Sequence, residues 1–258
     1  MRIVVLVKEV PDTYGDRKIT LETGLVDRGA GESVLDEIGE RAVEAALSVQ
    51  AAVPESTVTV VAMAPAGAAD SLRRALAMGA DDAVHVCDDV LVGADVTLTA
   101  EVLAEAIRRH DADLVITGNA STDGGGGVMG ALLAEHLGFA QITNLSSLAV
   151  TATTVTGTRA TDAGTAHVEA ALPAVVGITE GMPDARYPSL KGIMAAKKKP
   201  VATVTAADLH ADVLGMNAAR AIVIAARERP PRSAGVTITD EGDAGVQLAR
   251  FIIDRKLA

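Results

Sequence analysis

The sequence predicts an α/β protein built on a doubly wound parallel sheet, extended by an antiparallel hairpin and a C-terminal arm. Short apolar runs rich in Val and Ile alternate along the first half of the chain with longer stretches of helical period. Only 2% of the residues are aromatic, so the core must consist of aliphatic side chains, as in sheets that helices cover on both faces. With 49% hydrophobic and 22% charged residues, the 258-residue chain has a globular composition and can bury a sizeable core.

Predicted strands and helices follow one another from the N-terminus. The run RIVVLV over 2–7 predicts a first strand that is buried on both faces. The stretch 33–50 predicts a helix, because apolar residues recur at i, i+4, i+7 and i+11 from Ile38, with Asp36 or Ser33 as its N-cap. The other predicted elements are strands over 58–63, 83–87 and 112–118 and helices over 68–79, 96–110 and 126–138, the first of these helices stopped by Gly79.

The pattern changes after about residue 145. Residues 147–179 are rich in Thr and Val, with turn points at Gly157 and Gly164, and predict an antiparallel hairpin or meander that ends in a strand. The tail has a break at Pro230–Pro231 and one predicted helix over 241–256. The predicted domains are a nucleotide-binding α/β domain over 1–203 and, over 204–258, an arm with a terminal helix that packs on a partner subunit.

Composition and motifs exclude several functions. The formal net charge of −11 repels a phosphate backbone and stacking platforms are scarce, so no nucleic-acid partner is expected. Cys87 is the only cysteine and the five histidines share no ligand spacing, so we expect neither a disulfide nor a metal site. No nucleophile motif such as GxSxG is present, and we expect no catalytic residues. The first apolar run is too short for a signal peptide or a membrane span, which predicts a cytoplasmic protein without direct membrane insertion.

The most informative loop is VITGNASTDGGGGVMG, which leaves a predicted strand at Thr117. Its consecutive glycines let backbone N–H groups approach an anion, and the N-terminus of the following helix favours negative charge. Ligands in open α/β sheets bind at the carboxyl ends of strands, so we interpret the loop as a phosphate cradle, with a flexible connection as the alternative. The spacing is neither GxGxxG nor GxxxxGK[ST], which argues against a dehydrogenase or an NTPase. Lys8, directly after the first strand, is equally compatible with a ligand contact and with an edge charge.

One basic stretch stands out in this acidic chain. No Asp or Glu occurs from Ala185 to Thr205, and five cations surround Leu190. These cations are Arg186, Lys191, Lys197, Lys198 and Lys199. Composition alone favours a solvated lysine-rich surface. A recognition site is the other interpretation, because an apolar anchor supplies affinity while flanking charges speed encounter.

The stretches VLVKEVPD, LRRALAMGADDAVHV, GNASTDGG and RYPSLKGIMAAKKKP, in this order, resemble the beta subunit of electron transfer flavoprotein. The resemblance covers about Met1 to Pro200. It implies a fold of the adenine-nucleotide alpha-hydrolase-like type, and a heterodimer whose alpha subunit carries most contacts to FAD while the beta subunit braces it. It also implies that the beta subunit binds AMP and has no turnover of its own. The implied partners are acyl-CoA dehydrogenases or related flavoenzymes, which donate electrons, and electron transfer flavoprotein–quinone oxidoreductase, which accepts them.

The resemblance further implies which residues make these contacts. The implied AMP contacts are Leu6, Asp36, Glu37, Ile38, Gly39, Met63, Gly118, Asn119, Ala120, Ser121, Thr122, Asp123, Gly124, Gly125, Gly126, Gly127, Val128 and Met129. In the implied recognition loop, Leu190 enters an apolar pocket of the donor dehydrogenase. The cations that meet its acidic rim are Arg186, Lys191, Lys197, Lys198 and Lys199.

Two departures from the family pattern concern the nucleotide. Asp36-Glu37-Ile38 stands where the family often has Asn-Pro-Phe, and Gly126 to Met129 stands where polar residues are usual. One alternative is therefore a bifurcating-type beta subunit, with a second FAD in place of AMP. Another is a stand-alone adenine-nucleotide sensor that resembles a universal stress protein; the basic stretch and the long tail argue against it.

Overall fold

The computed structural model describes residues 1–15, 17–210, 219–232 and 235–257. The chain forms two compact units, Met1–Ala226 and Arg227–Ala258. Three parts of the predicted arm, residues 211–218, 233–234 and 258, lie outside the described residues. That the arm begins at 204 and packs on a partner subunit stays a prediction.

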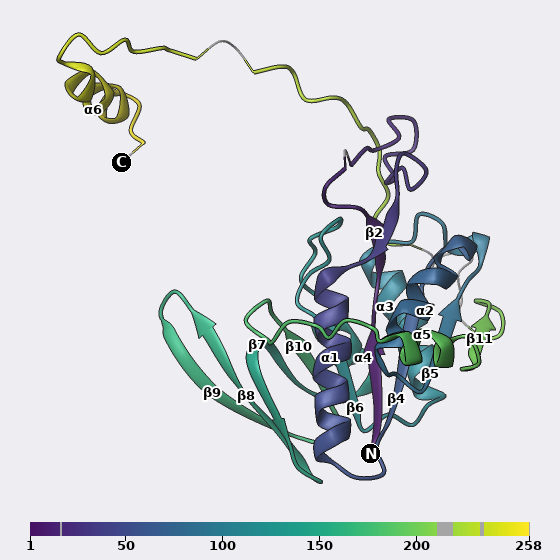
Figure 1. Cartoon of the computed structure of the whole chain (residues 1–258). Helices are drawn as coiled ribbons and strands as arrows, with labels where there is room; N and C mark the ends of the chain where they lie inside the picture. The colour runs from purple at the N-terminus through teal and green to yellow at the C-terminus, as the bar shows by residue number, and fades with distance from the viewer. Residues whose placement is uncertain (16, 211–218, 233–234, 258) are drawn as a thin grey trace. The chain divides into compact units, whose positions relative to one another are not determined.

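One large sheet organises the first unit (Figure 1). Its strands are β1 (Arg2–Leu6), β4 (Thr57–Met63), β5 (Asp82–Val86), β6 (Leu114–Gly118), β7 (Ala140–Val150), β8 (Thr154–Thr161), β9 (Gly164–Ala171), β10 (Ala174–Ile178) and β11 (Val201–Val204). Within the described residues their order is β11-β5-β4-β1-β6-β10-β7-β8-β9. Neighbours from β11 to β7 are parallel, and β7, β8 and β9 pair antiparallel. The predicted parallel sheet with an antiparallel hairpin is therefore confirmed, and β10 lies between β6 and β7 although it follows β9 in the chain.

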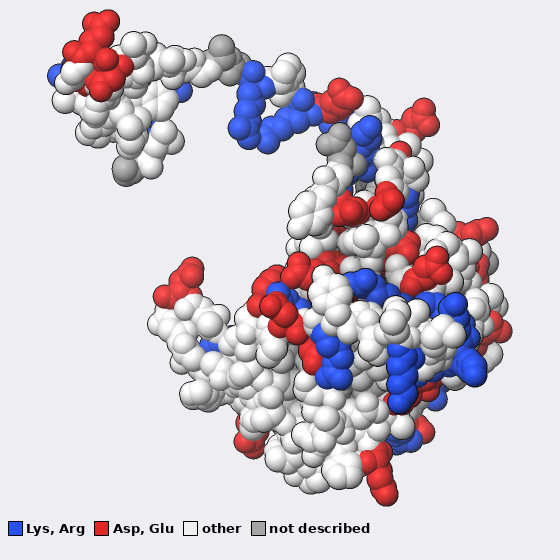
Figure 2. All heavy atoms as spheres, in the orientation of Figure 1, with Lys and Arg blue, Asp and Glu red and all other residues white. Residues whose placement is uncertain are grey.

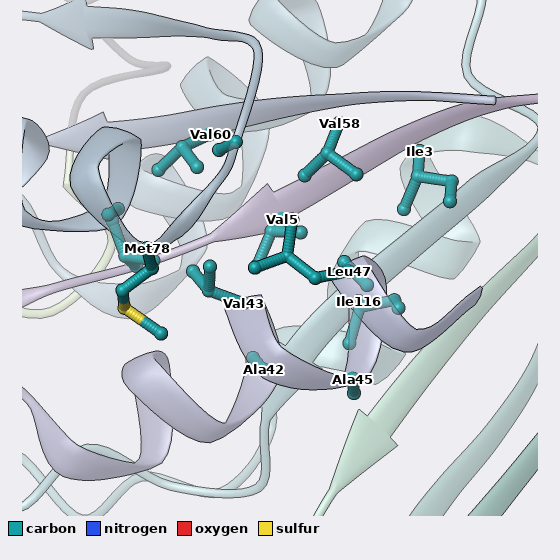
Figure 3. Packing of buried hydrophobic residues seen from close by; sticks show 14 of the residues in the cluster. Ile3, Val5, Ala42, Val43, Ala45, Leu47, Val58, Val60, Met78 and Ile116 are labelled. Carbon is teal, nitrogen blue, oxygen red and sulfur yellow. The ribbon is translucent and has the colours of Figure 1, made fainter. Parts of the chain in front are cut away.

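Helices cover both faces of the parallel part. The main ones are α1 (Glu37–Ala52), α2 (Ala69–Met78), α3 (Val96–Arg108) and α4 (Met129–Leu137). Successive side chains of a strand point to opposite faces, so Val5 packs in the core under α1 and α2, and Val4 packs in the core under α3 and α4. Figure 3 shows the first core, where Val43 and Leu47 of α1 point toward the sheet. The core is aliphatic, as the scarcity of aromatic residues predicts.

The sequence analysis did not predict several short elements. β2 (Glu9–Pro11) pairs antiparallel with β3 (Ser33–Leu35), so α1 begins at Glu37 rather than at Ser33. Two short 3-10 helices are η1 (Ala66–Ala68) and η2 (Asp89–Leu91). The basic stretch, predicted as a loop, contains the helix α5 (Leu190–Ala196), because the Ser189 hydroxyl caps it by accepting a 3.1 Å hydrogen bond from the Gly192 N–H.

The second unit contains the predicted terminal helix, α6 (Ala244–Asp254), which is shorter at both ends than the pattern indicates. Within its own unit α6 buries none of its residues, although its sequence is amphipathic. In the parts of the chain that the structure describes, no helix has both the length and the apolar character needed to cross a membrane.

Candidate nucleotide site and basic helix

A cavity of about 340 Å³ opens at the carboxyl ends of β1, β4 and β6, where open α/β sheets bind ligands. Most of the residues predicted to contact AMP line it. These are Leu6, Asp36, Ile38, Gly39, Met63, Gly118, Asn119, Ala120, Ser121, Gly124, Gly126, Gly127, Val128 and Met129. Glu37, Thr122, Asp123 and Gly125 do not line the cavity. The fold thus brings together the strand ends, the start of α1 and the glycine-rich loop.

Asp36 joins the start of α1 to the glycine-rich loop. It occupies the N-cap position of α1 without making a side-chain capping bond; instead one carboxylate oxygen accepts a 2.9 Å hydrogen bond from the Thr122 N–H. Its other oxygen, Oδ1, is buried and has no partner among the described residues. Burial raises the pKa of Asp36 although the bonds from Thr122 oppose this. Asp36 and Thr117 both line the cavity, and the Thr117 hydroxyl is likewise buried without a partner among the described residues.

Asp123 anchors the glycine-rich loop without lining the cavity itself. Its side chain is only 4% exposed and lies 2.6 Å from the Lys8 ammonium and 3.7 Å from the Arg28 guanidinium. Burial alone would raise the pKa of Asp123, but the hydrogen bond and charge of Lys8 outweigh it and the pKa is lowered. Lys8 therefore serves both as a wall of the cavity and as the ionic partner of the loop.

The glycine run turns the chain toward the cavity. Gly125 and Gly127 adopt positive φ angles of 60° and 67°, a region that favours glycine. α4 then begins at Met129, and its N-cap residue Val128 makes no side-chain capping bond. The first amides of a helix lack partners within the helix, and Val128 and Met129 at this helix start line the cavity, so an anion can be bound there.

The sequence interpretation missed one wall of the cavity. This wall is formed by Ala94, just before α3, and by Val96, Thr99 and Leu103 of α3; Val7 and Thr117 also line the cavity. Asp95 shapes this wall, because its carboxylate accepts from the Leu98 N–H at 2.9 Å and also from the Arg220 and Ala221 N–H groups. Asp95 is the N-cap of α3, and an Asp directly before a predicted helix is the one signal in the sequence that could have indicated this wall.

The basic stretch forms a second candidate site. Tyr187, Leu190, Ile193 and Met194, here called the α5 face, are exposed, with Leu190 at 84% and Tyr187 at 90%. Lys191, Lys197 and Lys198 are also exposed, and Figure 2 shows Lys and Arg side chains gathered over α5. Arg186 instead forms a two-pronged ion pair with Glu44 of α1, with N–O distances of 2.7 and 2.8 Å. Lys199 points into the chain, toward carbonyl groups of α2.

Residues 23–209 match the model of the electron transfer flavoprotein domain. A protein named electron transfer flavoprotein subunit beta from Mycobacterium leprae is 45% identical, over 99% of this chain and 98% of its own. Proteins of the same name from Syntrophomonas wolfei and Bacillus subtilis are each 34% identical, covering 98% and 82% of this chain and 96% and 82% of their own. The chain therefore belongs to the electron transfer flavoprotein family, among its beta subunits.

Proposed function

We propose that this chain is the beta subunit of a cytoplasmic, heterodimeric electron transfer flavoprotein with no turnover of its own. In this proposal an alpha subunit holds most of an FAD, while this chain braces the FAD and binds AMP. Acyl-CoA dehydrogenases or related flavoenzymes donate electrons, and electron transfer flavoprotein–quinone oxidoreductase accepts them. The FAD supplies the redox chemistry; the residues of this chain bind the nucleotide and present the α5 face to the donor.

The cavity is the observation that carries the AMP assignment. Its glycine-rich loop and the start of α4 offer backbone donors for a phosphate. Asp36 and Thr117 line the same cavity and each has one buried side-chain oxygen without a partner among the described residues, so these side chains can bond nucleoside amine and hydroxyl groups. A volume of about 340 Å³ lies near the lower end of the range for small-molecule sites, roughly 300–1,000 Å³. This size favours a mononucleotide over a dinucleotide such as FAD.

The heterodimer is supported by α6. A helix with an apolar stripe is stable in water only when that stripe packs against something. Val246, Leu248 and Ile253 of α6 are each more than half exposed. We propose that the alpha subunit covers them.

The first test is to co-express this chain with its alpha subunit, purify the complex, and identify the released nucleotides by chromatography. We expect one FAD and one AMP per heterodimer. Two FAD and no AMP would instead support the bifurcating type. ATP on a homodimer that ignores the alpha subunit would overturn the proposal in favour of a sensor. A complex carrying Thr99→Trp, which fills the cavity from α3, serves as the control and is expected to lose AMP while keeping FAD.

Leu190→Ala tests the α5 face. We expect the KM for a cognate acyl-CoA dehydrogenase to rise about 30-fold, which corresponds to the loss of about 2 kcal/mol at an apolar hot spot. Flavin and AMP content should not change, because Leu190 does not line the cavity. Val92→Ala is the matched control, since Val92 is 70% exposed and belongs to the segment between η2 and α3, not to the α5 face. Equal KM values for the Leu190 variant and the wild type would refute this role.

A further inference from the structure

Two cations hold α5 against α2: one in α2 binds the C-terminal end of α5, and one just after α5 binds the C-terminal end of α2. Arg73, in the middle of α2, donates to the Ala196 and Lys199 carbonyl groups at 2.6 and 2.8 Å, at the C-terminal end of α5. Lys199, just beyond α5, donates to the Leu76 and Gly79 carbonyl groups at 3.1 and 3.0 Å, and also to that of Ala80. Both contacts place a positive charge where the helix dipole is negative, so each helix end is stabilised.

The two helices also approach closely. A Cβ atom added at Gly192 would lie 2.3 Å from the carbonyl oxygen of Ala77 in α2. On the same side of α5, Ala196 is only 2% exposed. The side of α5 that faces α2 is thus made of small residues, and its remaining large residues form the exposed α5 face.

This arrangement separates Lys199 from the other predicted rim cations. An ammonium group has three N–H donors, and those of Lys199 have three carbonyl acceptors within the chain. Lys191, Lys197 and Lys198 are exposed, and their ammonium groups make no hydrogen bond or ion pair among the described residues. Only the exposed lysines are therefore free to meet an acidic partner.

We propose that Lys199, together with Arg73, is a positioning residue rather than a recognition cation: it holds α5 so that Leu190 stands clear of the chain. An isolated helix of seven residues is unstable in water, so α5 depends on its contacts with α2. Without the Lys199 contacts, the α5 face loses its fixed shape even though Leu190 is unchanged. This inference rests on the proposed docking role of the α5 face, but its first test does not.

The first test is amide hydrogen exchange on the full heterodimer, comparing Lys199→Met with Lys198→Met. Both variants lose one positive charge, and methionine keeps an unbranched side chain that is one atom shorter than that of lysine. We expect exchange of the amides of Ile193 to Lys197 to speed up at least tenfold in Lys199→Met and to stay at the wild-type rate in Lys198→Met. Gly192→Ala pushes α5 away from α2 without changing the charge and should also speed up exchange in α5. This variant replaces Lys199→Met in the test if Lys199→Met does not fold.

The second test measures the KM for the donor dehydrogenase at low and high salt. Loss of a rim cation weakens binding mainly at low salt, because exposed charges are screened. We expect Lys198→Met to behave in this way, and Lys199→Met to raise KM about tenfold at both salt concentrations with kcat unchanged. Identical exchange rates and identical salt dependence in the two variants would overturn the positioning role. Faster exchange with an unchanged KM in both Lys199→Met and Leu190→Ala would refute the docking role while leaving the attachment of α5 intact.

Discussion

Asp123→Ala is expected to lower the free energy of unfolding by about 3 kcal/mol. The substitution removes a buried carboxylate, leaves Lys8 and Arg28 without their shared partner, and deletes the 2.6 Å bond from the Gly124 N–H. Breaking a fully buried pair costs about 3–5 kcal/mol, and this pair lies at the low end because the Lys8 side chain is 42% exposed and can be hydrated. Urea titration of the purified protein measures the change. Glu105→Ala, on the exposed i,i+3 pair with Arg108, is the control and should cost less than about 0.5 kcal/mol.

The pH dependence of the free energy of unfolding distinguishes the contribution of the Asp123 charge from that of its packing. Its pKa is lower in the folded than in the unfolded state, so the stabilisation is complete above the unfolded pKa of about 3.9 and is lost as the pH falls through the folded pKa. The difference in the free energy of unfolding between wild type and Asp123→Asn should therefore be constant from pH 7 to about pH 5 and become smaller at pH values below about 4. A difference that stays constant to pH 3 would show that the charge is not responsible.

Gly118→Ala is expected to lower the free energy of unfolding by about 2 kcal/mol and to weaken nucleotide binding. A Cβ atom at this position would lie 2.7 and 2.8 Å from Cγ1 and Cγ2 of Ile38, in the first turn of α1. Ile38 is branched at Cβ and buried, so its side chain has little freedom to move aside and the start of the helix must shift. The start of α1 is a wall of the cavity, and its displacement should reduce the AMP content of the purified complex.

Gly126→Ala is the matched control for this substitution. Gly126 lines the same cavity, but a Cβ atom there meets nothing within 4 Å. Its free energy of unfolding should stay within about 0.5 kcal/mol of wild type. Equal losses of stability in both variants would mean that the contact with Ile38 is not the cause.

Long apolar runs made most of the fold predictable. β1 and β6 contain continuous runs of Val, Ile and Leu, and β4 contains three Val residues; such sequences are typical of strands buried between two layers of helices. The sequence did not predict β11 and α5, because each is short and lies beside a lysine run. Their secondary structure depends on contacts with other parts of the chain, with β5 for β11 and with α2 for α5. No local pattern shows that β10 pairs with β6 rather than with β9.

The candidate site was predictable only where the chain itself carries the signal. The glycine-rich loop follows a strand directly, so its position at a carboxyl end could be deduced. The wall at Val96 and Leu103 depends on which helix lies beside the loop in space, which the sequence does not state. Likewise, a run of three lysines gives no indication that Lys199 points inward while Lys197 and Lys198 point outward.

The place of β10 in the sheet has a consequence for synthesis of the protein. Because β10 fills the gap between β6 and β7, a nascent chain that ends before Ala174 has two unpaired strand edges at the middle of its sheet. Such edges are templates for pairing with other chains. We therefore expect the sheet of the nascent chain to be incomplete and prone to aggregation until residues 174–178 have left the ribosome, and chains truncated before β10 to be recovered as aggregates.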